Sequence, residues 1–290
     1  MILKDILLNC NPPHFLVDNT MYLTRMGSVA YGVSDDLSDE DLYGWCIPPK
    51  EYLFPSSFGY IEGFDSPPEF EQYQKHHIES GEKQFDVVIY NVTKYFRLVM
   101  ENNPNMIDSL FTARKHILHS TEASELVREN RKLFIHKGCF VKFRGYSYSQ
   151  MQKMFHFHAE GKRKEQIEKQ GYDVKFAYHL VRLLGEVKQL LTTGDLDLEK
   201  DNEILKEIRG GEWTSQEVVR YFEENEKILE KQYEESKLPE RTDFFEIKKL
   251  LMNILETHYG SFNEIKQSDE KAYHFMDQIM EICEQWRRTK

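Results

Sequence analysis

Two aspartates in the segment MGSVAYGVSDDLSDEDLYG, residues 26–44, have the spacing of a cation-binding pair. Asp39 and Asp41 stand at the start of a predicted strand, and strand side chains alternate between the two faces of a sheet. Both carboxylates therefore point to one side, and Glu40 points to the other. Carboxylate oxygens grouped in this way suit a hard divalent cation such as Mg²⁺ or Mn²⁺. The sequence thus predicts a metal site at the mouth of the sheet.

A glycine and a serine precede this pair and suit a phosphate. Gly27 lets a ligand approach the backbone closely, and Ser28 offers a hydroxyl and a backbone N–H to a phosphate oxygen. Two other motifs are excluded. A P-loop requires lysine where Val33 stands, and an EF-hand loop counted from the first aspartate would place Tyr43 and Lys50 at ligand positions. The plain alternative is a solvated acidic turn between two strands.

These residues resemble the signature of the DNA polymerase β superfamily of nucleotidyltransferases, a Gly-Ser followed by Asp-x-Asp. The fuller pattern GSVAYG…LSDEDLYG is similar to the nucleotidyltransferases of the YcgL type, among them the RNA-ligase-associated polymerase-β proteins. Weaker similarity runs through FDVVIYNVTKYFRLVMENNPNMID, FRGYSYSQ and GYDVKFAYHLVRLL. The resemblance implies an α+β fold, in which a small polymerase-β-type α/β domain precedes an all-helical domain. It also implies that Gly27, Ser28 and Ser38 bind the nucleotide.

A third carboxylate on a neighbouring strand is a further implication of the resemblance. Asp86 is the candidate, because it is the one acid within the apolar run FDVVIY, where an unpaired carboxylate would be costly. Glu82 is the second choice, and a water-exposed Asp86 is the alternative. Two divalent ions, Mg²⁺ or Mn²⁺, held by Asp39, Asp41 and Asp86 would clamp the attacking oxygen and the leaving pyrophosphate. The implied reaction moves an NMP from an NTP, with ATP favoured, to a hydroxyl group.

Residues 173–191 predict an amphipathic helix that carries a basic stripe. Lys175, His179 and Arg182 fall on one face at about 100° per residue, and apolar residues occupy the opposite arc. We expect this stripe to bind the triphosphate across a cleft. The alternative is a solvated surface face in which Arg182 pairs with Glu186 at i,i+4.

The acceptor is inferred from the distribution of charge. The chain has a net charge of −11, but residues 131–175 hold eleven Lys or Arg against four Asp or Glu, a local charge of +7. With its interleaved tyrosines, this segment favours an RNA 3′ end, tRNA above all, as the acceptor. The expected acceptor-binding residues are Lys142, Arg144, Tyr148, Lys162, Arg163 and Lys164. Alternatives are a protein hydroxyl that is adenylylated, a small molecule, or a catalytically inactive module that only binds nucleotides.

The elements that position these residues divide the chain near residue 120. Eight of the nine prolines lie before this point, among short β-like runs and turns, and His76 and His77 are expected in a loop. Strands are predicted at residues 19–25, 41–47 and 85–90. Helices are predicted at residues 93–100, 106–111, 120–132, 148–170, 173–192, 201–208, 215–236, 243–259 and 268–289. We therefore predict a catalytic domain at 1–120 and a helical domain at 121–290 that closes the cleft.

Composition argues against several other classes of protein. Hydrophobic residues make up 40% of the chain, and no apolar run approaches the roughly 18 residues of a membrane span. The four cysteines lie far apart without a C-x-x-C pair, which argues against a disulfide framework and a thiolate zinc site. We expect a cytoplasmic enzyme that has no membrane partner.

Overall fold

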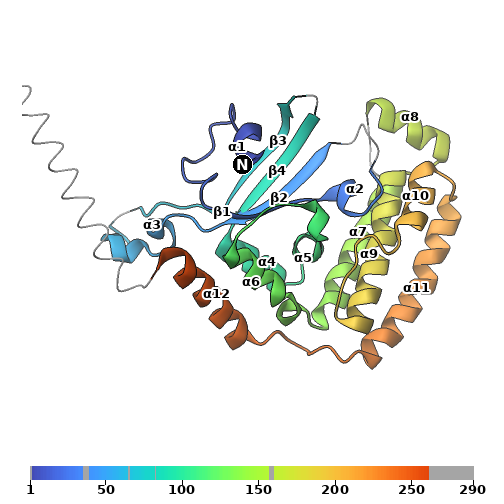
Figure 1. The fold of residues 1–290 in the computed structure, drawn as a ribbon. Coiled ribbons are helices and arrows are strands. Elements are labelled where there is room, and N and C mark those ends of the chain that lie inside the picture. The colour runs from blue at the N-terminus through green and yellow to red at the C-terminus, as the bar shows by residue number, and fades with distance from the viewer. Residues whose placement is uncertain (1, 35–38, 65, 82, 157–159, 261–290) are drawn as a thin grey trace, which may run out of the picture.

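A five-stranded mixed sheet forms the centre of the protein (Figure 1). The computed structural model describes residues 2–34, 39–64, 66–81, 83–156 and 160–260, without the side chains of residues 2 and 162. In the order β3-β4-β2-β1-β5, β2 and β4 pair parallel, and the other neighbours pair antiparallel. The strands are β1 (Thr20–Arg25), β2 (Glu40–Cys46), β3 (Gln72–Ser80), β4 (Lys83–Asn91) and β5 (Ile117–Ser120).

The strands β1, β2 and β4 confirm the predicted runs, whereas β3 and β5 have no counterpart among the predicted strands. The loop expected at His76 and His77 is wrong, because both residues lie within β3, at a bulge between Lys75 and Ile78. β3 is an edge strand whose side chains are mostly exposed. The alternation of apolar and polar residues that marks a half-buried strand is therefore missing from its sequence.

The two faces of the sheet are buried against different helices. On one face, Leu42 and Cys46 of β2 belong to a small apolar cluster with the N-terminal helix α1 (Ile2–Ile6). On the other face, Trp45 stacks on Tyr95 at 5.9 Å between ring centroids. This second face lies toward α4 (Val92–Met100), α5 (Pro104–Phe111) and α6 (Glu122–Glu129) (Figure 1).

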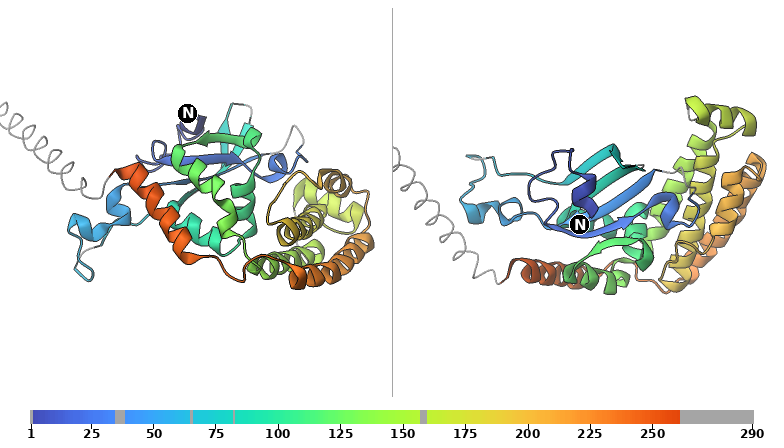
Figure 2. Two further views of the ribbon diagram at one scale, coloured as in Figure 1. Left: turned by 60° about the horizontal axis from the view of Figure 1, so that its bottom comes forward. Right: turned by 45° about the horizontal axis from the view of Figure 1, so that its top comes forward.

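A second group of helices lies beside the sheet, as Figure 2 shows. It comprises α7 (Gly138–His156), α8 (Gly161–Gln170), α9 (Val174–Thr193), α10 (Asn202–Gly210) and α11 (Ser215–Glu235). The single helix predicted at 148–170 is wrong: α7 begins earlier, and α8 starts at Gly161, whose φ of 58° a continuous right-handed helix excludes. The predicted helix at 268–289 lies outside the described residues.

The last described helix, α12 (Phe244–Tyr259), returns to the sheet and packs against α6. The Tyr259 hydroxyl donates a hydrogen bond to the carbonyl of Pro48. The short elements are α2 (Gly27–Ala30), α3 (Lys50–Leu53) and the 3₁₀ turns η1 (Pro55–Phe58), η2 (Arg114–His116) and η3 (Arg131–Phe134). Over the described ranges, no helix combines the length and the apolar character that crossing a membrane requires.

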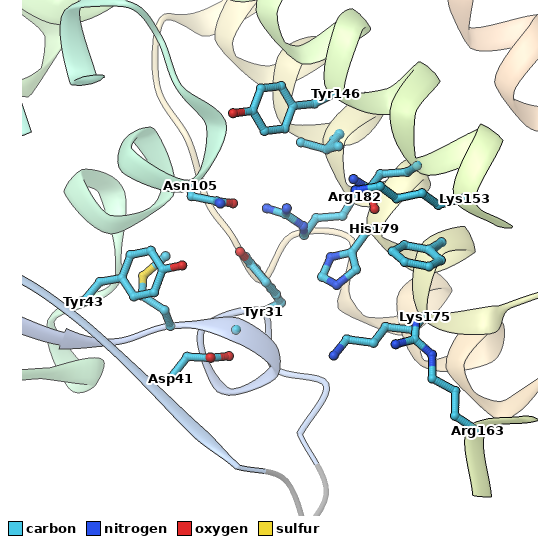
Figure 3. Close-up of a pocket in the computed structure, with 15 residues that line it drawn as sticks. Tyr31, Asp41, Tyr43, Asn105, Tyr146, Lys153, Arg163, Lys175, His179 and Arg182 are labelled. Atoms are coloured by element: carbon cyan, nitrogen blue, oxygen red, sulfur yellow. The ribbon is translucent and has the colours of Figure 1, made fainter. Parts of the chain in front are cut away.

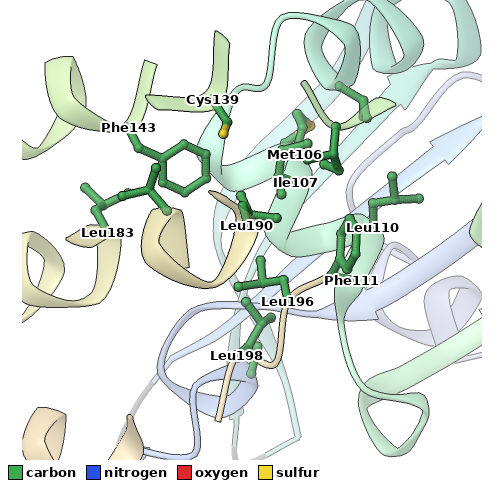
Figure 4. Packing of buried hydrophobic residues seen from close by; sticks show 14 of the residues in the cluster. Met106, Ile107, Leu110, Phe111, Cys139, Phe143, Leu183, Leu190, Leu196 and Leu198 are labelled. Atoms are coloured by element: carbon green, nitrogen blue, oxygen red, sulfur yellow. The ribbon is translucent and has the colours of Figure 1, made fainter. Parts of the chain in front are cut away.

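One hydrophobic core joins the sheet to the helices. Residues of α5, such as Ile107 and Phe111, belong to the same buried cluster as Phe143 of α7 and Leu190 of α9 (Figure 4). Because folded interiors are closely packed, the elements that share this core hold fixed positions relative to one another. Functional side chains on the sheet and on α9 can therefore form a single site.

Candidate active site

A pocket of about 440 Å³ opens between the start of β2 and the helices α7 and α9 (Figure 3). This size falls within the range of small-molecule sites. Asp41 and Tyr43 of β2 and Gly27 of α2 line one side. The other side carries cationic and polar groups from three helices, namely Tyr146, Gln150, Lys153, Arg163, Lys175, His179 and Arg182.

Gly27 and Asp41 are packed against each other at the turn from β1 into α2. Gly27 has a φ of 62°, a left-handed conformation that favours glycine. A methyl group at this position would overlap the carboxylate of Asp41. Ser28 is half-buried next to Gly27 and is not among the residues that line the pocket. Ser38 lies outside the described residues.

The carboxylates of β2 alternate as the sequence predicts. Glu40 is buried on the side away from the pocket, where Arg25 at 2.9 Å and Lys83 form ion pairs with it. Asp41 lines the pocket, and the exposed Asp39 precedes β2. Burial raises the pKa of the Asp41 carboxyl. The negative charges of Asp86 and Asp39 raise this pKa further, whereas the positive charge of Lys175 lowers it in part.

Asp86 lies beside Asp41 on the parallel strand β4, in direct register with it. Residues in register on neighbouring strands share a face, so the two carboxylates belong to one side of the sheet. The Nδ1 atom of His76 lies 2.9 Å from one Asp86 oxygen, and the backbone N–H of His77 donates to the other at 2.8 Å. Partial burial acts to raise the pKa of the Asp86 carboxyl, but the hydrogen bonds from His77 and His76 outweigh it and lower this pKa.

The acidic side of the site has the donor chemistry that a divalent cation requires. Within the described part of the chain, no three His, Cys, Asp or Glu side chains stand together as a preformed metal site. Hard oxygen donors are nevertheless supplied by Asp39, Asp41 and Asp86. The negative charges of the other two repel the Asp41 carboxylate, and a bound cation would relieve this repulsion. These residues fit Mg²⁺ or Mn²⁺.

Arg182 is anchored in a buried ionic network. Its Nη1 atom pairs with Asp108 of α5 and, at 2.8 Å, with Glu186 one turn further along α9. The guanidinium lies 4.3 Å from the ring centre of Tyr31, whose hydroxyl donates to Asp108 at 2.8 Å. The sequence left open an exposed i,i+4 ion pair between Arg182 and Glu186 instead of a binding stripe. The pair forms, but it is buried. Burial raises the pKa of both acids.

His179 lies among cations. Burial lowers the pKa of its imidazole well below the ordinary range, and nearby Arg182 and Lys175 lower it further. His179 is therefore neutral at neutral pH and can donate or accept a hydrogen bond in the pocket. The structure brings the predicted Lys175, His179 and Arg182 together on the wall that faces Asp41 (Figure 3).

The predicted acceptor residues separate into two groups. Arg163 lines the pocket, and its guanidinium donates to Asp173, the N-cap residue of α9, at 2.9 Å. Lys164 lies 3.9 Å from Glu168, and the side chain of Lys162 lies outside what the structure describes.

Three predicted acceptor residues of α7 do not reach the pocket. Arg144 and Tyr148 both contact Glu226 of α11, at 2.7 and 3.0 Å, and Lys142 lies 3.5 Å from Glu101. The face of α7 opposite Arg144 and Tyr148 supplies the pocket residues Tyr146, Gln150 and Lys153 instead. Tyr146 and Lys153 belong to the basic and aromatic segment that the sequence indicated, whereas Gln150 was missed.

The chain is similar in sequence to a known protein family. Residues 13–280 match the family described as the RNA repair pathway DNA polymerase beta family. The chain belongs to this family. This membership confirms the resemblance to the polymerase β superfamily. It also supports the prediction that the protein is a nucleotidyltransferase. The chain is also similar to a nucleotidyltransferase-like protein from Exiguobacterium sibiricum, with 10% identity, a TM-score of 0.28 and coverage of 75% of this chain and 69% of that chain. No curated protein matches the chain.

Proposed function

We propose that this member of the RNA repair family transfers an NMP from an NTP to a hydroxyl acceptor and releases pyrophosphate. The observation that supports it best is the packing of Gly27 against Asp41, with Asp86 in register on the next strand. Two carboxylates on one face of the sheet, across a pocket from several cations, are the arrangement that nucleotidyl transfer needs. In this proposal, residues 1–120 are the catalytic domain and residues 121–290 close the cleft.

Asp39, Asp41 and Asp86 would hold Mg²⁺ or Mn²⁺, whose chemistry is neutralisation of charge on the triphosphate and on the attacking hydroxyl. The cations of the opposite wall, Lys175, Lys153 and Arg163, would bind the phosphate oxygens and orient the leaving pyrophosphate. No side-chain nucleophile is required, since positioning and charge stabilisation supply the rate enhancement.

ATP is the donor that we favour. Asn105 and Gln150 line the pocket, and neither side chain makes a hydrogen bond to another described residue. Side-chain amides can donate and accept together, which suits the edge of an adenine base.

The acceptor that we favour is an RNA 3′ end, tRNA above all. The family is described as part of an RNA repair pathway, and residues 131–175 carry a local charge of +7, with eleven Lys or Arg against four Asp or Glu. RNA and NTP substrates also fit the cytoplasmic location expected from the sequence. A protein hydroxyl, a small molecule and a module that only binds nucleotides are the competing outcomes of the test.

The test is incubation of the protein and Mg²⁺ with each α-³²P-labelled NTP in the presence of total RNA and total protein, followed by gel separation. We expect label from ATP on an RNA band, abolished by EDTA and by Asp41→Asn. Label only on a protein band would overturn the RNA acceptor. Nucleotide binding in calorimetry without any labelled product would overturn the enzymatic function.

A further inference from the structure

The exposed face of β3 carries a chain of hydrogen-bonded side chains that ends on Asp86. The amide nitrogen of Gln72 donates to the amide oxygen of Gln74 at 2.9 Å. The amide nitrogen of Gln74 lies 2.7 Å from Nε2 of His76, and Nδ1 of His76 lies 2.9 Å from Oδ2 of Asp86. Residues 72, 74 and 76 alternate along the strand, so their side chains share one face of the sheet with Asp86.

This chain determines which nitrogen of His76 carries the proton. Because the oxygen of the Gln74 amide accepts from Gln72, its nitrogen is left to face the imidazole. An amide nitrogen can only donate, so Nε2 of His76 accepts. The hydrogen on Nδ1 is donated to Asp86, whose carboxylate can only accept.

The bulge in β3 supplies a second donor. The register between β3 and β4 shifts between Lys75 and Ile78, and His77 has a φ of 54°. The left-handed conformation at a residue other than glycine costs free energy that its surroundings must offset. Here it turns the backbone N–H of His77 toward Oδ1 of Asp86, at 2.8 Å. Each oxygen of this carboxylate is therefore held by one donor from β3.

These contacts do little for stability. The side chains of His76 and Asp86 are 50% and 23% exposed, so water can replace either hydrogen bond at small cost. What the two donors determine is the orientation of the carboxylate, and each oxygen keeps a lone pair for another partner.

We infer that His76, oriented by Gln74, and the backbone N–H of His77 are positioning groups that aim the Asp86 carboxylate at a divalent cation shared with Asp41. The inference rests on the proposed function, in which Asp86 is a cation ligand. Carboxylates that bind a metal are commonly oriented by such hydrogen bonds, and loss of one weakens metal binding or activity about 10–100-fold.

Mn²⁺ binding in the absence of nucleotide, measured by electron paramagnetic resonance, tests the inference. His76→Ala should weaken Mn²⁺ binding about tenfold or more, toward the value for Asp86→Asn. His76→Asn should recover most of the affinity, because its amide N–H can take the place of Nδ1–H. Under turnover, His76→Ala should lower kcat and leave the KM for NTP and the melting temperature almost unchanged.

The backbone donor has its own matched pair of variants. His77→Gly keeps the N–H and adopts a positive φ readily, so Mn²⁺ affinity should be retained. His77→Val cannot adopt this conformation without strain, so the N–H should turn away and Mn²⁺ affinity should fall.

Mn²⁺ binding by His76→Ala that equals the wild type would overturn the inference, as would an asparagine variant no better than alanine. Unchanged affinity in Asp86→Asn would overturn both the inference and the assignment of Asp86 as a ligand. If the Mn²⁺ affinities follow the expected order while no acceptor is labelled, the positioning role stands and the proposed transfer fails.

Discussion

Gly27 is a position in the site that cannot accommodate a side chain. Its left-handed φ and its contact with the Asp41 carboxylate leave no room for a side chain. We expect Gly27→Ala to displace Asp41 and to lower nucleotidyl transfer by about 10²-fold or more, because small displacements in a site are costly. Gly59→Ala is the matched control, since Gly59 also has a positive φ but open space around it. Comparable losses of transfer in both variants would show that backbone strain, and not the contact with Asp41, is responsible.

The two carboxylates in register should affect stability in opposite directions. The folded state raises the pKa of Asp41, so the ionised group destabilises the fold at neutral pH, and this penalty disappears as the pH falls toward about 4. Asp41→Asn should therefore raise the melting temperature at pH 7 and have little effect near pH 4. The pKa of Asp86 is lowered, but its hydrogen bonds with His76 and His77 are partly exposed to water, so Asp86→Asn should reduce stability at pH 7 only slightly. Melting curves across pH check both signs, and a destabilising Asp41→Asn at pH 7 would contradict the electrostatic account.

At the scale of elements, the network around Arg182 ties α9 to α5 and to the end of α2. One guanidinium faces two carboxylates, Asp108 and Glu186, which are 0% and 3% exposed. Arg182→Gln leaves two buried acids without a cation and should cost about 3–5 kcal/mol. Glu186→Gln leaves Arg182 paired with Asp108 alone and should change the free energy of unfolding little. Urea denaturation measures the free energy of unfolding of both variants, and equal losses would contradict the idea that Arg182 is shared by two buried acids.

The helix α7 presents different faces to the pocket and to α11. Lys153→Glu should raise the KM for NTP roughly tenfold or more, because it places a negative charge where the phosphates bind. Arg144→Glu should leave this KM unchanged and lower stability, because Glu226 and Glu230 face Arg144. Steady-state kinetics with melting curves separate the two effects, and a raised KM for Arg144→Glu would place the phosphates on the α11 side instead.

Sequence alone predicts the parts of the site that depend on local periodicity. The opposite orientations of Asp41 and Glu40 follow from strand alternation, and the shared face of Lys175 and Arg182 follows from helical spacing. The partner of Arg182 could not be predicted in this way, because Asp108 is distant in the chain. For the residues of α7, composition indicated a basic and aromatic segment, but only packing against α11 decides which face meets the pocket.

At the scale of the whole molecule, the site lies where the sheet and the helical part share one core. β2, α7 and α9 contribute to the same buried cluster, so Asp41 and the cationic wall of the pocket are fixed relative to each other. The chain as a whole has a charge of −11, and the cations on the pocket wall are a local exception to it. A polyanionic substrate is therefore expected to bind at this wall and not over the general surface.

We propose that Asp41 and Asp86 act together in divalent-dependent nucleotidyl transfer. The most direct measurement is pyrophosphate release from ATP with total RNA, for the wild type, Asp41→Asn, Asp86→Asn and Glu40→Gln. Glu40 is the control, because it is adjacent in sequence but faces away from the pocket. We expect release from the wild type and from Glu40→Gln, and none from either aspartate variant or in the presence of EDTA. Release by either aspartate variant at the wild-type rate, or undiminished release with EDTA, would contradict the account.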